Sequence, residues 1–236
     1  MTRATIQQVG RPDLRQIGDE IISSAAVPTI CPEPQKVDGL NDDEMLEFLI
    51  EEGLRPSTAD ELTITLKRIR LLANHYYRAR DFDWQDIREH ETRTFLIVPF
   101  LLALGWSEQQ IKIELAVIGG RVDIACFSRS YRKNNTECVL LLESKGFSQG
   151  LDYAHQQGKN YAAEFSNCQV VVASNGYCYK AYGRKTTETG FEEHPSAYLN
   201  LLRPTKQYPL NPSVGGGLEL LSYLLPNSCR TDKQVP

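Results

Sequence analysis

Three ionisable residues in this 236-residue chain stand in strongly apolar surroundings. Asp123 lies between Val122 and Ile124, and Glu143 and Lys145 follow the apolar run 139–142. A charged group beside an apolar core is costly unless it is paired or binds a metal. We therefore interpret Asp123, Glu143 and Lys145 as a candidate metal-dependent site for the hydrolysis of phosphodiester bonds.

That chemistry needs neutralisation of the phosphate, activation of a water molecule and stabilisation of the leaving oxygen, which one or two Mg²⁺ ions supply. Magnesium takes hard oxygen ligands and keeps several waters, so one or two carboxylates suffice to hold it. Asp123 and Glu143 are the expected ligands, with the backbone carbonyl of Ser144 as a third. Lys145 would lie beside the attacking water, where it could orient that water or stabilise charge on the phosphate.

The elements that carry these residues are predicted to be two paired strands. Residues 122–125 and 140–145 are short, apolar and rich in branched side chains, and a polar turn at 128–135 joins them. Side chains alternate along a strand, so Glu143 and Lys145 should project from one face. The run 139–142 predicts that the second strand is buried on both faces.

A fourth carboxylate, Glu91, is predicted on a helix that runs from about residue 86 to 104. Glu91, Phe95, Val98 and Leu102 recur at three- and four-residue steps, so Glu91 lies on or next to the stripe that faces the core. A carboxylate there is unusual without a partner. We expect Glu91 to bind the metal directly or through a water, and Pro99 to kink the helix.

The alternative for Glu143 and Lys145 is a surface pair on an exposed strand. A Glu-x-Lys sequence alone is a weak signal, since chance yields about one in a chain of this length at average composition. The apolar neighbours of Asp123 and Glu143 favour the functional interpretation.

Periodicity and turn residues predict further elements on both sides of this pair. The predicted helices with both ends defined are 41–53, 151–165 and 197–202. A further helix is predicted to be capped by Ser57 or Thr58 together with Glu61, and a last one to end near residue 225. The predicted strands are 111–117, 169–173 and 177–182.

These elements predict an α/β (α+β) fold with a mixed central sheet flanked by helices and an N-terminal helical extension. The expected divisions are a flexible arm (1–40), a helical extension (41–85), a core with C-terminal helices (86–226) and a tail (227–236).

Composition adds few restrictions. Hydrophobic residues make up 41% and charged residues 24%, and the net charge of −4 weighs mildly against a nucleic-acid binder, which usually has a basic surface. The six cysteines form no C-x-x-C pair, which disfavours zinc. No signal peptide or apolar span is visible, so we expect a cytoplasmic protein without a membrane partner.

The order of these motifs resembles the PD-(D/E)XK nuclease superfamily, and within it the N-terminal nuclease domain of type I restriction enzyme R subunits. The resemblance covers roughly residues 88–182. Its matching pieces are Glu91-Thr92 with Phe95, Leu104-Gly105-Trp106, Gly120-Arg121-Val122-Asp123, Leu142-Glu143-Ser144-Lys145, Gln157 with Tyr161, and Ser174-Asn175-Gly176.

The resemblance implies a restriction-endonuclease-like fold and a Mg²⁺-dependent nuclease, with Mn²⁺ able to substitute. It implies that Asp123, Glu143 and Lys145 carry catalysis and that Glu91 assists the metal. Gln157 and Tyr161 would position the nucleic acid or the lysine, and Arg121 and Lys159 are grouped with them as nucleic-acid contacts. The implied partner is nucleic acid, with DNA expected, and a role in restriction or host defence within a homo-oligomer or a larger complex is compatible with it.

One feature of the full R subunit is missing. No Gly-x-x-x-x-Gly-Lys-Ser/Thr phosphate loop occurs here, so ATP-driven translocation is not assigned. Two other interpretations stay open at this point, namely a non-catalytic module that binds nucleic acid or protein on the same fold, and a nuclease that acts on RNA.

Overall fold

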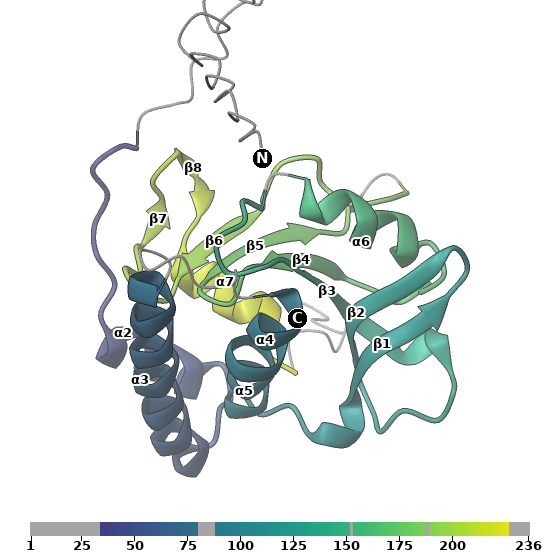
Figure 1. Ribbon diagram of the computed structural model, residues 1–236, viewed down its shortest axis with the longest axis horizontal. Helices are drawn as coiled ribbons and strands as arrows, with labels where there is room; N and C mark the ends of the chain where they lie inside the picture. Colours follow the sequence, from purple (N-terminus) through teal and green to yellow (C-terminus); the bar gives the residue numbers. More distant parts are fainter. Residues whose placement is uncertain (1–33, 80–87, 152, 187–188, 227–236) are drawn as a thin grey trace, which may run out of the picture. The chain divides into compact units, whose positions relative to one another are not determined.

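The central feature of the computed structural model is a mixed sheet with helices on both faces (Figure 1). The structure describes residues 34–79, 88–151, 153–186 and 189–226. In this part of the chain, eight strands follow the order β1-β2-β3-β4-β5-β6-β8-β7. The mixed α/β sheet flanked by helices that the sequence predicts is therefore confirmed.

The strands are short, and most are paired with a sequence neighbour. The pairs β3–β4 and β6–β8 are parallel and the other pairs are antiparallel. Their bounds are β1 Ile111–Val117, β2 Gly120–Phe127, β3 Cys138–Ser144, β4 Val170–Ser174, β5 Cys178–Gly183, β6 Ala197–Asn200, β7 Gln207–Tyr208 and β8 Asn211–Gly215.

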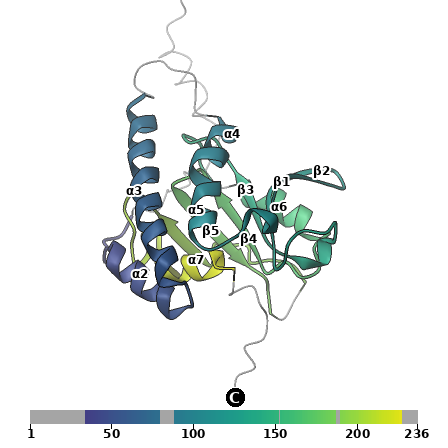
Figure 2. The ribbon, with the colours of Figure 1, turned by 90° about the horizontal axis from the view of Figure 1, so that it is seen from below.

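The helices divide between the two faces of the sheet. Their bounds are α2 Asp42–Glu51, α3 Pro56–Ala79, α4 Glu89–Thr92, α5 Val98–Ala103, α6 Ala154–Ala162 and α7 Gly217–Leu224, with a π-helical turn (η2, Arg93–Ile97) joining α4 to α5. One apolar cluster joins α2, α3, α5 and α7 to one face, and α6 covers β3 and β4 on the other face. Figure 2 shows α3 and α5 side by side on their face.

Strand β3 is the centre of this arrangement, because all seven of its residues are buried. Leu140 and Leu142 face the helices α3 and α5, whereas Leu141 lies in the cluster under α6. The predicted burial on both faces is thus confirmed. Antiparallel pairing with β2, in the register Ile124 with Leu142, also confirms the predicted strand pair.

Helices α2 and α3, expected as an extension, share the apolar core of the sheet. Met45 and Leu49 of α2 and Leu66 of α3 belong to the same buried cluster as Leu142 of β3. The predicted cap at Ser57 or Thr58 is wrong, because α3 already begins at Pro56. Proline suits the first turn of a helix, where its missing N–H leaves no bond unmade.

The helix predicted at 197–202 is also wrong. Ala197 to Asn200 forms β6, which pairs with β5 and hides Ala197 and Leu199 in the core. Tertiary pairing here overrides a short pattern that fits either element. The proline-rich stretch after it contains β7 and β8.

The remaining boundaries differ in detail. Helix α6 is shorter than the predicted 151–165. Residues 1–33 of the predicted arm, residues 80–87 and the tail 227–236 lie outside the described residues. The last part of the predicted arm is in contact with the fold, since Gln35 N–H donates to the Pro209 carbonyl and Leu40 N–H to the Pro204 carbonyl. In the described part of the chain, no helix has the length and apolarity to cross a lipid bilayer.

The shared core generates a stability prediction. Leu66→Ala in α3 removes a side chain that is 3% exposed and should lower the free energy of unfolding by about 2–4 kcal/mol. Leu71→Ala on the same helix is the control, because Leu71 is 63% exposed and its loss should cost under about 0.5 kcal/mol. Urea denaturation measures both, and equal costs would show that α3 does not belong to the core.

Candidate active site

Asp123 links β2 to the end of β3. Its Oδ2 accepts hydrogen bonds from the backbone N–H of Ser144 at 2.7 Å and from the Ser144 hydroxyl at 2.9 Å. Asp123 and Glu143 come directly next to the paired residues Ile124 of β2 and Leu142 of β3, and the negative charge of Asp123 raises the pKa of Glu143. The aspartate and the Glu-Ser-Lys segment are therefore brought together, as the sequence predicts.

Arg93 is the cation next to Asp123, and the sequence analysis missed it. Its Nη2 lies 3.0 Å from Asp123 Oδ1, and its Nη1 donates to Glu114 Oε1 at 3.1 Å. Its Nε lies 3.3 Å from the hydroxyl oxygen of Ser144. The Arg93 side chain is 7% exposed, so these bonds compensate a charge that is almost completely withdrawn from water.

A π-helical turn carries Arg93 toward the sheet. Residue 98 donates its backbone N–H to the carbonyl of Arg93, five residues back. Pro99 follows directly and has no N–H to give to the carbonyl four residues back, so a regular α-helical turn cannot be completed there. A wide turn of this kind is often found at functional sites, and the kink expected at Pro99 stays a prediction.

The helix carboxylate at this centre is Glu89 rather than Glu91. Glu89 Oε1 lies 3.3 Å from the Ser144 hydroxyl and 3.7 Å from Arg93 Nη2. Burial and the neighbouring Asp123 raise the pKa of Glu89 above its ordinary value. The Glu89–Arg93 spacing of four residues is a helix-pair signal that the sequence does contain.

Glu91 is placed toward α3 instead. Its Oε2 is buried and has no hydrogen-bond partner among the described residues. Burial, and then the charge of Glu91, raise the pKa of Tyr76 in α3. Glu89 and Glu91 are two residues apart, which is about 200° around a helix, so only Glu89 reaches Ser144.

Glu143 lies on the face covered by α6. Its side chain passes under Gly158, where a Cβ atom would come within 3.0 Å of Glu143 Cγ and 2.7 Å of Val171 Cγ1. A glycine inside a helix is ordinarily destabilising. At this position it provides the space that the glutamate occupies.

The carboxylate of Glu143 is poorly compensated. Its Oε1 is buried and accepts no hydrogen bond from the residues that the structure describes. Burial, and then the charge of Asp123, raise the pKa of Glu143 to about 8, while Lys145 opposes the shift. A cation next to this oxygen would supply the charge compensation that the protein lacks.

Glu114 of β1 completes the acidic surroundings. It occupies the β1 position opposite Asp123 and adopts a φ of +52°, which is rare for a residue with a side chain. Its carboxylate accepts from Arg93 on one oxygen and from Arg121 at 3.5 Å on the other. The alternation of residues 111–117 predicted a strand, but gave no sign of this strained backbone at Glu114.

The carboxylate oxygens at this site are of the kind that bind a hard cation. Asp123 and Glu143 supply carboxylates, and one or two such ligands can hold Mg²⁺. In the described ranges, no three His, Cys, Asp or Glu side chains are arranged to hold one metal ion. The fit therefore depends on the two carboxylates and a backbone carbonyl such as that of Ser144. Lys145, whose N–H donates to the Ser174 carbonyl, stands next to them at the end of β3.

Two of the predicted nucleic-acid contacts lie together on α6. Gln157 donates to the Tyr161 hydroxyl at 3.1 Å, and that hydroxyl packs against Gly120 in the β1–β2 hairpin. Arg121 is next to Gly120 and its side chain is 69% exposed. Gln157 is adjacent in sequence to Gly158, the position that covers Glu143.

Lys159 has a different environment from the other predicted contacts. Its Nζ donates to the backbone carbonyl of Glu192 and lies 4.5 Å from the centroid of the Tyr182 ring. Burial lowers the pKa of Lys159. The described contacts thus tie Lys159 to the loop after β5 rather than to Gln157 and Tyr161.

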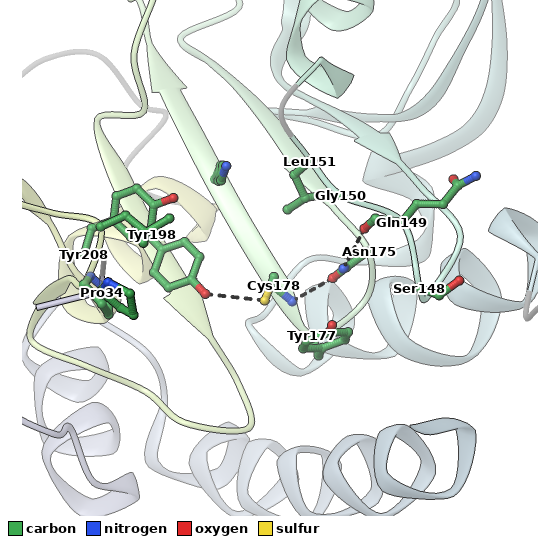
Figure 3. A pocket seen from close by; sticks show the side chains of 13 residues that line it. Pro34, Ser148, Gln149, Gly150, Leu151, Asn175, Tyr177, Cys178, Tyr198 and Tyr208 are labelled. Atoms are coloured by element: carbon green, nitrogen blue, oxygen red, sulfur yellow. Dashed lines mark hydrogen bonds between the residues drawn. The ribbon is translucent and has the colours of Figure 1, made fainter. Parts of the chain in front are cut away.

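A separate cavity of about 540 Å³ opens beside the β4–β5 turn (Figure 3). Tyr198 and Tyr208 stack at 4.4 Å between ring centroids on one side of it. Asn175 closes another side by donating to the Gln149 carbonyl. None of Asp123, Glu143 and Lys145 lines this cavity.

Comparison with protein-family models, with curated proteins and with solved structures finds no match for this chain. The functional interpretation therefore depends on the geometry of the site.

The raised pKa of Glu143 predicts how stability changes with pH in metal-free protein. The folded state keeps this proton up to about pH 8, whereas an unfolded glutamate loses it near its ordinary value of 4.5. The stabilisation from Glu143 is therefore complete below pH 4.5 and is lost as pH rises through 8. Glu143→Gln removes this loss, so its stability relative to wild type should improve between pH 5 and 9 by on the order of 2–4 kcal/mol.

Thermal and urea unfolding in EDTA measure this difference at both pH values. The exposed Glu108→Gln is the control and should show a constant difference. A Glu143→Gln difference that does not change with pH would mean that Glu143 is ionised in the folded protein.

Proposed function

We propose that this protein is a Mg²⁺-dependent nuclease of the PD-(D/E)XK type with a restriction-endonuclease-like core, and that DNA is its substrate. The observation that carries the proposal is the buried, uncompensated carboxylate of Glu143 beside Asp123 and Lys145. A buried carboxylate without a partner is costly to maintain. Glu143 lies at the end of a central strand, next to a second carboxylate and a lysine. A divalent cation bound there would compensate its charge.

Asp123 and Glu143 would hold the ion, with the Ser144 carbonyl as a further oxygen ligand. Mg²⁺, when bound, supplies Lewis acidity for the phosphate and favours ionisation of a bound water. Glu143 would be ionised in that state, because a neighbouring cation lowers the pKa of a carboxyl group.

Lys145 would hold a water molecule or a phosphate oxygen in place. It lies close enough to Glu143 and Glu89 to oppose the rise in pKa of both groups. An ammonium group there can donate to a phosphoryl oxygen as negative charge develops on it. The hydroxyl of Ser144, bonded to Asp123, keeps that ligand in place.

The α6 side offers a surface for the nucleic acid. Gln157 and Tyr161 form one polar pair there, and Arg121 extends from the neighbouring hairpin. An exposed arginine can bind the phosphate backbone, and a tyrosine can contact sugar or base. Glu89, rather than Glu91, is the helix carboxylate that we assign to the site.

A cleavage assay tests the proposal directly. Purified protein should cut supercoiled or linear DNA in Mg²⁺ or Mn²⁺ but not in EDTA, and Lys145→Ala should lower the rate on the order of 100-fold or more. Lys67→Ala, an exposed lysine on α3, is the matched control and should retain wild-type activity.

RNA should be tested in parallel, since cleavage of RNA alone would change the substrate but not the chemistry. Absence of cleavage under all conditions, or equal cleavage by Lys145→Ala, would favour the alternative of a non-catalytic module that binds nucleic acid or a protein.

A further inference from the structure

We infer that Arg93 is the resident cation of the metal-free site and releases Asp123 Oδ1 when a divalent cation binds. The inference rests on the proposed function, because it concerns the same site. It assigns to Arg93 a positioning and gating role toward the cation rather than contact with the reacting phosphate.

Three carboxylates surround the guanidinium of Arg93. Arg93 lies 3.0 Å from Asp123, 3.1 Å from Glu114 and 3.7 Å from Glu89. With a side chain only 7% exposed, it is shielded from water more completely than any of these three partners. Arg93 thus supplies positive charge at the point where negative side chains converge.

The two carboxylate oxygens of Asp123 have different partners. Oδ2 already accepts two hydrogen bonds from Ser144, at 2.7 and 2.9 Å. Oδ1 is the oxygen that faces Arg93 Nη2. A divalent cation that takes Asp123 as a ligand through Oδ1 therefore meets the guanidinium, which carries charge of the same sign.

Arg93 has other acceptors with which it can pair when it leaves Asp123 Oδ1. Glu89 Oε1 is 3.7 Å from Nη2, slightly beyond a good hydrogen bond, so a small rotation of the guanidinium can shorten that contact. The bond from Nη1 to Glu114 can act as the pivot. A guanidinium has five N–H donors, so it can exchange one acceptor for another without being left unpaired.

Removal of this competitor should strengthen metal binding. Arg93→Met keeps an unbranched side chain but removes the charge next to Asp123 Oδ1. The variant should bind Mn²⁺ at least about threefold more tightly than wild type, because a guanidinium a few ångströms from the ion no longer repels it. In EDTA the same variant should be less stable, because the carboxylates of Asp123, Glu114 and Glu89 lose the cation that they share.

Titration of Mn²⁺ followed by electron paramagnetic resonance measures the affinity independently of activity. Arg121→Met is the matched control, because Arg121 also pairs with Glu114 but no described contact joins it to Asp123. The control should bind Mn²⁺ within about twofold of wild type, since its charge is largely exposed and screened. Equal or weaker Mn²⁺ binding by Arg93→Met, in a protein whose wild type binds Mn²⁺, would overturn the role of Arg93 and leave the nuclease proposal intact. Failure of the wild type to bind Mn²⁺ at all would overturn both.

A measurement on unsubstituted Arg93 covers the case in which Arg93→Met does not fold. The Nε–H resonance of Arg93, assigned by its loss in Arg93→Lys, should shift as Mg²⁺ is added, because one of its partners changes. The Arg121 resonance should stay in place. An Arg93 resonance unaffected by saturating Mg²⁺ would overturn the exchange of partners.

Discussion

The site depends on the contacts that the carboxylate of Asp123 makes with Ser144 and Arg93. Two hydrogen bonds from Ser144 fix it against the end of β3, and Arg93 connects it to the helix on one face of the sheet. Hydrogen bonds that involve a charged group are stronger than hydrogen bonds between two neutral groups. One side chain thereby fixes a strand pair and a helix relative to each other, and through β3 it fixes the position of Glu143.

Departures from regular backbone gather around this contact. The helix that carries Arg93 widens into a π turn, Glu114 adopts a positive φ opposite Asp123, and Gly158 leaves space for Glu143. Each of these features costs stability by itself. Their concentration at one end of β3 is typical of a site whose geometry is maintained for chemistry.

The sequence was sufficient where a local pattern decided the structure. The apolar run before Glu143 predicted a fully buried strand, and the capping box of Asn41 and Glu44 marks the start of α2. The sequence was insufficient where residues distant along the chain determine the secondary structure. The four residues of β6 are compatible with a helix or a strand, and their pairing with β5 makes them a strand. Likewise, periodicity could place Glu91 near the core stripe, but the π turn and the contacts of Ser144 determine that Glu89 reaches the site.

The most direct test of this account is a crystal structure of the protein soaked in Mn²⁺, with anomalous scattering recorded to locate the ion. We expect an anomalous peak between Asp123 and Glu143, about 2.1 Å from a carboxylate oxygen of each, with the Arg93 guanidinium displaced from Asp123 Oδ1. A site that stays empty at millimolar Mn²⁺, with Arg93 still bonded to Asp123, would contradict the proposal that these carboxylates are held together to bind a divalent cation.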